Sequence, residues 1–157
     1  MNLEEGKKIP AFNLDGSNGK KIKLSDIGTE NIVIYFYPKD DTPGCTNQAK
    51  DFSKLKSKFS KLNSEIFGIS PDSIEKHKKF ITKHNLKIIL LADEENKTSI
   101  KYGVWKEKNL YGKKYMGIER TTFLVNKDKR IIKIWKKVRV NGHAEEVLEV
   151  LKEIQNS

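Results

Sequence analysis

The sequence contains a single cysteine, Cys45, among its 157 residues. One cysteine excludes an internal disulfide and any zinc site built from several thiolates. The histidines His77, His84 and His143 do not stand at metal-ligand spacing, and the first two, on one expected helix, are typical of an exposed helix face. We therefore expect no metal and no other cofactor.

Long hydrophobic runs are also missing, because the longest, Ile32–Tyr37, is far shorter than the roughly 18 residues of a membrane span. The opening segment, Met1–Glu5, has acidic residues and no apolar core, so no signal or transit peptide is visible. We expect a cytoplasmic protein with no membrane partner. The length, and the absence of repeats, linkers or composition breaks, predict a single domain over residues 1–157.

Arginine is scarce. Of 31 basic residues only Arg120, Arg130 and Arg139 are arginines, in a chain of formal net charge +10. Such a charge can attract nucleic acid, anionic lipid or acidic partners. A nucleic-acid surface usually relies on arginine for bidentate contacts, whereas these lysines are spread along the whole chain. The pattern favours a solvated surface, and we expect no nucleic-acid partner.

The apolar residues that are present follow a strand-like pattern in some segments and a helix-like pattern in others. Three short runs rich in β-branched and aromatic residues predict buried strands at Ile32–Tyr37, Glu65–Ser70 and Ile88–Leu91. Two further runs, Thr122–Val125 and Ile131–Trp135, flank a polar turn and predict a hairpin.

Helical patterns lie between and after these runs. Apolar residues recur every three or four positions over 49–62 and again over 144–154. Asp72, with Glu75 three residues later, resembles a capping box for a helix that ends near His84. The order of elements predicts an α/β fold with a mixed central sheet flanked by helices.

Cys45 follows the strand Ile32–Tyr37 at a turn rich in proline, glycine and aspartate. Thr42 suits the N-cap and Pro43 the first helical position, so Cys45 is expected in the first turn of the next helix. There the free backbone N–H groups and the helix dipole favour the thiolate, which is the nucleophilic form.

The alternative is that Cys45 is a small buried hydrophobe, the commonest role of a lone cysteine. Its neighbours Pro43, Gly44, Thr46 and Asn47 are not typical core residues. A strand-to-helix turn also opens toward solvent at the end of the sheet where α/β sites are found. These features favour a reactive cysteine.

The segment Pro38-x-x-x-Thr42-x-x-Cys45 resembles the active-site signature of the peroxiredoxins. The fuller stretch 36–46, together with 102–105 and 111–125, is similar to the peroxiredoxin Q, or bacterioferritin comigratory protein, subgroup. The similarity runs from Gly6 to the last helix. It implies a thioredoxin-like fold with an N-terminal extension.

The resemblance also implies roles for four residues. Cys45 would be the peroxidatic cysteine, Arg120 would stabilise its thiolate and bind a peroxide oxygen, Thr42 would offer its hydroxyl to the peroxide, and Pro38 would shield the sulfur from water.

Two alternatives remain around these residues. Arg120 could instead form a surface ion pair with Glu119. Gln48 and Asp51, one turn beyond Cys45, could orient donors around it, although solvated helix positions are the simpler interpretation.

The pattern departs from many members of the subgroup, which carry a resolving cysteine where this chain has Lys50. A sulfenic acid on Cys45 would therefore need an external thiol, such as thioredoxin, glutaredoxin or glutathione. The expected function is a thiol-dependent peroxidase acting on hydrogen peroxide and organic hydroperoxides in antioxidant defence. The subgroup resemblance favours a monomer.

Two rival functions remain. A thioredoxin-fold thiol transferase or reductase is disfavoured by the lack of a Cys-x-x-Cys pair. A nucleic-acid-binding module is suggested by the aromatic and lysine residues interleaved over Lys101–Tyr115, although a loop flanking the active site is the better interpretation.

Overall fold

The computed structural model describes residues 3–156. The strands are β1 (Asn13–Gly16), β2 (Lys21–Lys23), β3 (Asn31–Phe36), β4 (Ser64–Ser70), β5 (Ile89–Ala92), β6 (Trp105–Leu110), β7 (Lys113–Ile118), β8 (Thr121–Asn126) and β9 (Ile131–Trp135). The helices are α1 (Pro43–Lys61), α2 (Ile74–His84), α3 (Lys97–Lys101), α4 (His143–Gln155) and the short 3-10 helix η1 (Leu24–Asp26). Within residues 3–156 no helix has the length and apolar character needed to cross a membrane.

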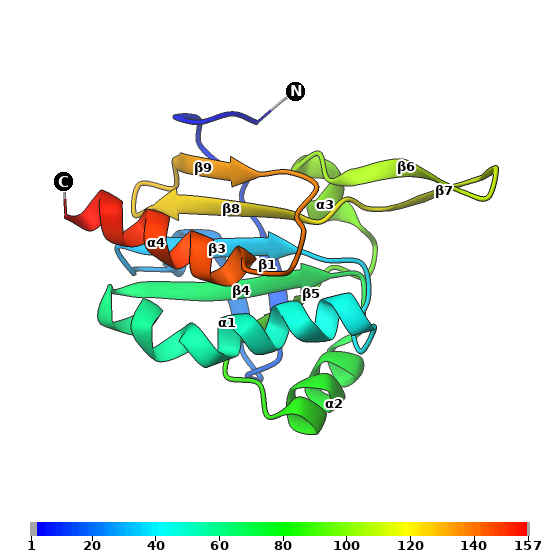
Figure 1. The fold of residues 1–157 in the computed structure, drawn as a ribbon, viewed down its shortest axis with the longest axis horizontal. Helices are drawn as coiled ribbons and strands as arrows, with labels where there is room; N and C mark the ends of the chain where they lie inside the picture. The colour runs from blue at the N-terminus through cyan, green and yellow to red at the C-terminus, as the bar shows by residue number, and fades with distance from the viewer. Residues whose placement is uncertain (1–2, 157) are drawn as a thin grey trace.

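Seven strands form one mixed sheet in the order β2-β1-β5-β4-β3-β8-β9 (Figure 1). The central strands β3, β4 and β5 pair in parallel, and α1 and α2 make the crossovers that parallel pairing requires. Strand β8 pairs antiparallel with both β3 and β9. The mixed α/β sheet and the predicted C-terminal hairpin are confirmed.

Strand β3 divides the core because all of its residues are buried. Successive side chains point to opposite faces of a strand. Val33 and Tyr35 pack with α1 and α4 on one face, while Ile34 and Phe36 pack on the other face with the N-terminal segment and the end of α3. In Figure 1, α1 and α4 lie side by side across one face of the sheet.

Of the two predicted helix starts, the first is confirmed and the second is wrong. Helix α1 begins at Pro43 with Thr42 as the N-cap residue, as predicted. Helix α2 is capped by Ser73, whose Oγ accepts a hydrogen bond from the Lys76 N–H, and not by Asp72. The Asp72 carboxylate is unavailable because it accepts hydrogen bonds from Ser70 and from the Asp40 N–H.

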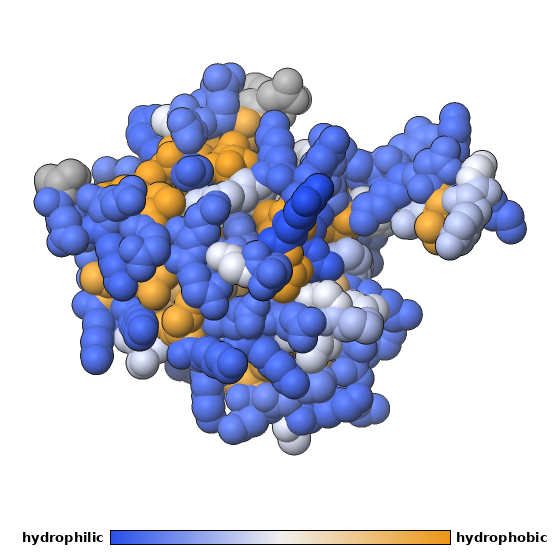
Figure 2. Space-filling view, in the orientation of Figure 1, coloured by the Kyte–Doolittle hydropathy of each residue, from blue (hydrophilic) through white to orange (hydrophobic). Residues whose placement is uncertain are grey.

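Two hairpins were not anticipated. Strands β1 and β2 extend the sheet beyond β5. Strands β6 and β7 form a separate ribbon that projects from the body (Figure 1), so the predicted loop over Lys101–Tyr115 is wrong. Figure 2 shows mostly hydrophilic surface along this ribbon, with paler and apolar surface near its tip, and the exposed residues there include Leu110 and Tyr111.

Candidate active site

Cys45 lies in the first turn of α1, directly after the turn that follows β3. The Thr46 N–H donates to the Thr42 carbonyl over 2.8 Å, so the helical ladder begins at the N-cap. The N–H groups of Gly44 and Cys45 consequently have no partner within the helix. These groups and the helix dipole favour negative charge at this end of α1.

The sulfur does not open to solvent as expected, because Cys45 is only 1% exposed. Its side chain joins the cluster of buried residues that includes Tyr35 and Phe52. Pro43 and Asn47 on either side are exposed. The polar character of the neighbouring residues therefore describes the outer side of the turn, while the cysteine side chain points inward.

A guanidinium reaches this buried sulfur. Arg120, between β7 and β8, donates from Nη2 to Cys45 Sγ over 3.4 Å and from Nη1 to Gln48 Oε1 over 2.6 Å. Its carbonyl oxygen accepts the Val138 N–H over 2.9 Å, which fixes its backbone. Charged donors form stronger hydrogen bonds to anionic acceptors. The contact therefore stabilises negative charge on the sulfur, which a purely hydrophobic cysteine site does not do.

The alternative partner of Arg120, Glu119, lies instead 3.9 Å from the Lys106 ammonium. Gly44 makes room for the guanidinium, because a Cβ at this position would stand 3.3 Å from Arg120 Nη2. The absence of a side chain at Gly44 thus helps Arg120 to approach the first turn of α1.

Gln48 is a site residue that sequence reasoning placed on the solvated face. It is 1% exposed and anchors Arg120, so that expectation is wrong. The available signal was its position three residues after Cys45, which puts both side chains on one face of the helix. Asp51 is partly exposed, and burial followed by the nearby Glu145 raises its pKa.

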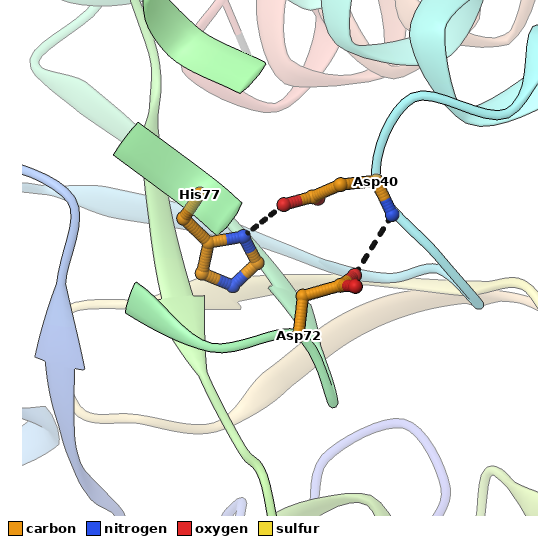
Figure 3. A group of neighbouring side chains, drawn as sticks. All are labelled: Asp40, Asp72 and His77. Atoms are coloured by element: carbon orange, nitrogen blue, oxygen red, sulfur yellow. Dashed lines mark hydrogen bonds and ion pairs between the residues drawn. The ribbon is translucent and has the colours of Figure 1, made fainter. Parts of the chain in front are cut away.

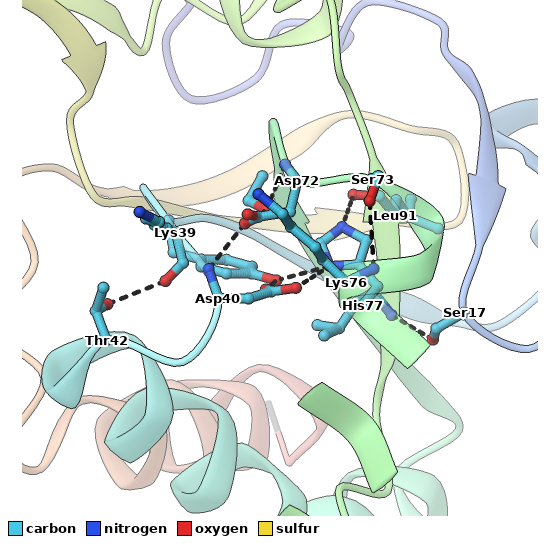
Figure 4. Close-up of polar contacts among 12 residues, drawn as sticks. Ser17, Lys39, Asp40, Thr42, Asp72, Ser73, Lys76, His77 and Leu91 are labelled. Carbon is cyan, nitrogen blue, oxygen red and sulfur yellow. Dashed lines mark hydrogen bonds and ion pairs between the residues drawn. The ribbon is translucent and has the colours of Figure 1, made fainter. Parts of the chain in front are cut away.

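Thr42 and Pro38 belong to the same turn, but the structure does not bring their side chains into hydrogen bonds with Cys45. The Thr42 hydroxyl donates to the Lys39 carbonyl over 3.0 Å and does not cap a helix N–H (Figure 4). Pro38 is partly buried at the start of the turn.

The hairpin of β6 and β7 carries a second cation, Lys108, near the site. Lys108 of β6 is half-buried, and its stem passes Gly117, where a Cβ would meet Lys108 Cδ at 3.4 Å. Burial, aided by the Arg120 charge, lowers the pKa of Lys108, while Cys45 and Glu119 raise it. Lys108 therefore lies within electrostatic reach of Cys45 and Arg120. Tyr102 is buried, so the aromatic residues of this region do not form one stacking surface.

His143 is a buried histidine behind the same region of the sheet. Its Nε2 lies 2.7 Å from Thr122 Oγ1, and its ring packs edge-on against Trp135. Burial lowers the pKa of His143 to about 4, with a further lowering from Arg120 and an opposing effect from Glu146. Its imidazole is therefore neutral at physiological pH.

One group of side chains has the composition of a metal site. Asp40, Asp72 and His77 each place a ligand atom within 4.8 Å of the others (Figure 3). His77 is 0% exposed, so its expected place on an exposed helix face is wrong. Both of its ring nitrogens already have hydrogen-bond partners, as do both oxygens of Asp40. Hydrogen bonding accounts for this cluster without an ion.

Residues 6–134 match the family described as AhpC/TSA. The chain belongs to the AhpC/TSA family. It is 51% identical over 154 residues to the peroxiredoxin Bcp of Bacillus subtilis, covering 98% of both sequences. A variant of Xylella fastidiosa PrxQ superposes with a TM-score of 0.93 at 34% identity, covering 99% of both chains.

The Xanthomonas campestris bacterioferritin comigratory protein, whose structures address its alkyl peroxide reduction, superposes with a TM-score of 0.86 at 40% identity and covers 90% of both chains. Peroxiredoxins are thiol-dependent peroxidases with a thioredoxin-like fold. The predicted family and fold are therefore confirmed. Cys45 is the single cysteine of the chain.

Proposed function

We propose that Cys45 is the peroxidatic nucleophile of a peroxidase that works with one cysteine. The observation that carries this proposal is the 3.4 Å contact between Arg120 Nη2 and Cys45 Sγ at the start of α1. The thiolate attacks one peroxide oxygen, the oxygen–oxygen bond breaks, and the second oxygen leaves with a proton as water or an alcohol. Cys45 is then a sulfenic acid.

Arg120 and the turn supply donors for this step. As the bond breaks, negative charge grows on the leaving oxygen, and the Arg120 guanidinium with the Gly44 and Cys45 N–H groups stabilises it without reorganisation. The Thr42 hydroxyl donates to Lys39, so its oxygen lone pairs remain available to accept the peroxide O–H. Pro38 excludes water from the sulfur.

Recycling requires a thiol from outside the chain, because Cys45 has no second cysteine to attack it and Lys50 occupies the position of the resolving cysteine. The first thiol displaces water from the sulfenic acid to form a mixed disulfide. A second thiol then releases the Cys45 thiol and leaves as an external disulfide. Thioredoxin, glutaredoxin and glutathione are the reductant classes proposed.

The substrates proposed are hydrogen peroxide and organic hydroperoxides. The alkyl peroxide reduction studied in the Xanthomonas campestris relative supports the second class. We propose further that the chain acts as a single-domain cytoplasmic monomer in cell redox homeostasis and antioxidant defence.

The decisive experiment is a stoichiometric peroxide pulse followed by mass spectrometry of Cys45 and then by a panel of reductants. We expect one equivalent of peroxide to be consumed per chain, an oxidised Cys45, and turnover only when thiol is supplied. The Cys45→Ser variant should consume none. An unoxidised Cys45 after the pulse would overturn the proposal, and faster turnover with a mixed-disulfide substrate than with peroxide would favour a thiol transferase.

A further inference from the structure

Hydrogen bonds of Asp40 attach the turn that leads to Cys45 to the rest of the protein. The Asp40 side chain is 5% exposed. Its Oδ1 accepts the Tyr37 hydroxyl over 2.6 Å, and its Oδ2 lies 2.7 Å from His77 Nδ1 (Figure 3). Its N–H donates to Asp72 Oδ2 over 2.8 Å. Asp40 is thus fixed through both its backbone and its side chain.

The partner of Asp40 on α2, His77, is fully buried. Its Nε2 lies 2.9 Å from the Leu91 carbonyl oxygen, which can only accept, so Nε2 carries a hydrogen. The 2.7 Å contact between Nδ1 and Asp40 Oδ2 then requires one proton between the two atoms. The pair consequently holds one shared proton and has no net charge, so its burial costs less than that of a single unpaired charge.

The next residue strengthens the same attachment. Asp41 has φ of 63°, a left-handed conformation that aspartate tolerates better than most residues. Its carboxylate accepts from Lys83 over 2.6 Å and lies 2.8 Å from His84 Nε2, both in the last turn of α2. Two successive residues of the turn are therefore tied to α2, one in the interior and one at the surface.

The turn closes on itself just before the helix. The Thr42 hydroxyl donates to the Lys39 carbonyl across Asp40 and Asp41 (Figure 4). Thr42 is the N-cap of α1, and Cys45 follows three residues later. Any displacement of Asp40 is transmitted through this short closed segment to the first turn of α1.

We propose that Asp40 and His77 form a positioning pair for the peroxide reaction, whose hydrogen bond sets the conformation of the turn 38–42 and so places Cys45 against Arg120. Neither residue acts on peroxide itself. The inference rests on the proposed role of Cys45 as nucleophile. Small misplacements of a reacting group reduce rates strongly, because the attacking and leaving atoms must be aligned.

The conservative variant Asp40→Asn separates the hydrogen-bond geometry of the pair from its shared proton. In Asp40→Asn the amide nitrogen donates to His77 Nδ1, the amide oxygen accepts from Tyr37, and Nε2 still donates to Leu91. Every hydrogen bond is kept while the shared proton is lost. Asp40→Ala removes the side-chain bonds to Tyr37 and His77 and keeps the backbone bond to Asp72, and His77→Gln replaces the rigid imidazole with a flexible amide.

The measurement is the second-order rate constant for oxidation of Cys45 by hydrogen peroxide, alongside its rate of alkylation by iodoacetamide, at a temperature well below each variant's Tm. In Asp40→Ala and His77→Gln the peroxide rate should fall by about tenfold to a hundredfold, as for loss of a hydrogen bond to a charged group. Alkylation should fall much less, because it does not need aligned donors. Asp40→Asn should stay within about threefold of wild type.

Ile66→Val is the matched control. Ile66 is 0% exposed near the start of β4, at the opposite end of that strand from Ser70 and Asp72. It should reduce stability and leave the peroxide rate unchanged. Equal slowing in Ile66→Val and Asp40→Ala, an unchanged rate in Asp40→Ala, or slow oxidation of Asp40→Asn would each overturn the proposal. If Asp40→Ala does not fold, His77→Gln decides. A wild-type Cys45 that ignores peroxide would instead refute the proposed function.

Discussion

The Arg120 guanidinium joins two residues of α1, reaching Cys45 Sγ over 3.4 Å and Gln48 Oε1 over 2.6 Å. Residues three apart lie on one face of a helix, so one planar fork can contact both. The Gln48 contact restrains the rotation of the guanidinium and leaves its second nitrogen directed at the sulfur. This geometry makes separate predictions for Arg120 and for Gln48.

Replacing Arg120 tests whether charge or fork geometry matters. Arg120→Ala should slow oxidation of Cys45 by about a hundredfold to a thousandfold, the usual effect of losing a donor aimed at developing charge. Arg120→Lys keeps the charge but cannot contact both Cys45 and Gln48. Its oxidation rate should therefore lie between those of wild type and Arg120→Ala. Stopped-flow kinetics of the peroxide reaction would show this order, and a lysine variant equal to wild type would contradict it.

Replacing Gln48 tests the anchor alone. Gln48→Leu keeps the approximate size of the side chain but removes the acceptor for Arg120 Nη1. We expect oxidation to slow by about tenfold, because the guanidinium is no longer held toward the sulfur. The exposed Asn47→Leu variant next to it is the control. Equal rates for Gln48→Leu and wild type would show that Arg120 is positioned by its backbone alone.

Tyr35 offers a prediction about stability. Its ring stacks on Phe52 with centroids 4.9 Å apart, and its buried hydroxyl has no hydrogen-bond partner among the described residues. An unpaired buried hydroxyl destabilises a fold. Tyr35→Phe should therefore raise the free energy of unfolding by about 1 kcal/mol in urea titrations. A clear loss of stability would show that the hydroxyl is satisfied in solution.

The glycine opposite Tyr35 makes a complementary prediction. A Cβ at Gly68 would stand 2.7 Å from Tyr35 Cζ and 2.8 Å from Leu90 Cδ2. Because both neighbours are buried and tightly packed, Gly68→Ala should destabilise the protein by about 1–3 kcal/mol. Urea unfolding measures this, with Gly28→Ala, where no atom lies within 4 Å, as control. Equal stability of the two variants would contradict the prediction.

Acid should weaken the fold through His143. Burial lowers its pKa from 6.5 to about 4. Between these values the unfolded chain binds a proton that the folded protein does not, so this contribution is complete above about pH 6.5 and is lost as the pH falls toward 4. The difference corresponds to at most about 3 kcal/mol.

The measurement for His143 is the free energy of unfolding at pH 7 and pH 5. His143→Gln should lose less stability than wild type over this interval, because no imidazole remains to be protonated. Asn47→Leu, at an exposed position without a titratable group, should keep the wild-type slope. Parallel slopes for wild type and His143→Gln would contradict the prediction.

The elements that follow from local pattern were predicted well. The run around β3 and the Thr42-Pro43 start of α1 depend on neighbouring residues alone. The ribbon of β6 and β7 was missed because lysines occupy both strands and its turn is Tyr111-Gly112, both at positive φ, and not the more familiar Asn-Gly.

The site was only partly predictable for a different reason. Gln48 and His77 are polar helix residues, and such residues usually face solvent. Their partners Arg120 and Asp40 lie 72 and 37 residues away in sequence, so only the folded chain brings them together. The burial of Cys45 was missed in the same way, because its sequence neighbours show the outer side of the turn and not the direction of its own side chain.

Cys45 is almost completely enclosed, and this restricts the access of reactants to its sulfur. Hydrogen peroxide is the smallest of the proposed reactants, whereas organic hydroperoxides and protein thiols are larger and reach the sulfur only when the first turn of α1 opens. Turnover at saturating reductant therefore has a ceiling equal to the frequency of this opening. Hydrogen exchange at the Thr46 amide, which closes the first helical bond to Thr42, reports the same event without any substrate, and its rate equals that ceiling at a pH where every opening leads to exchange.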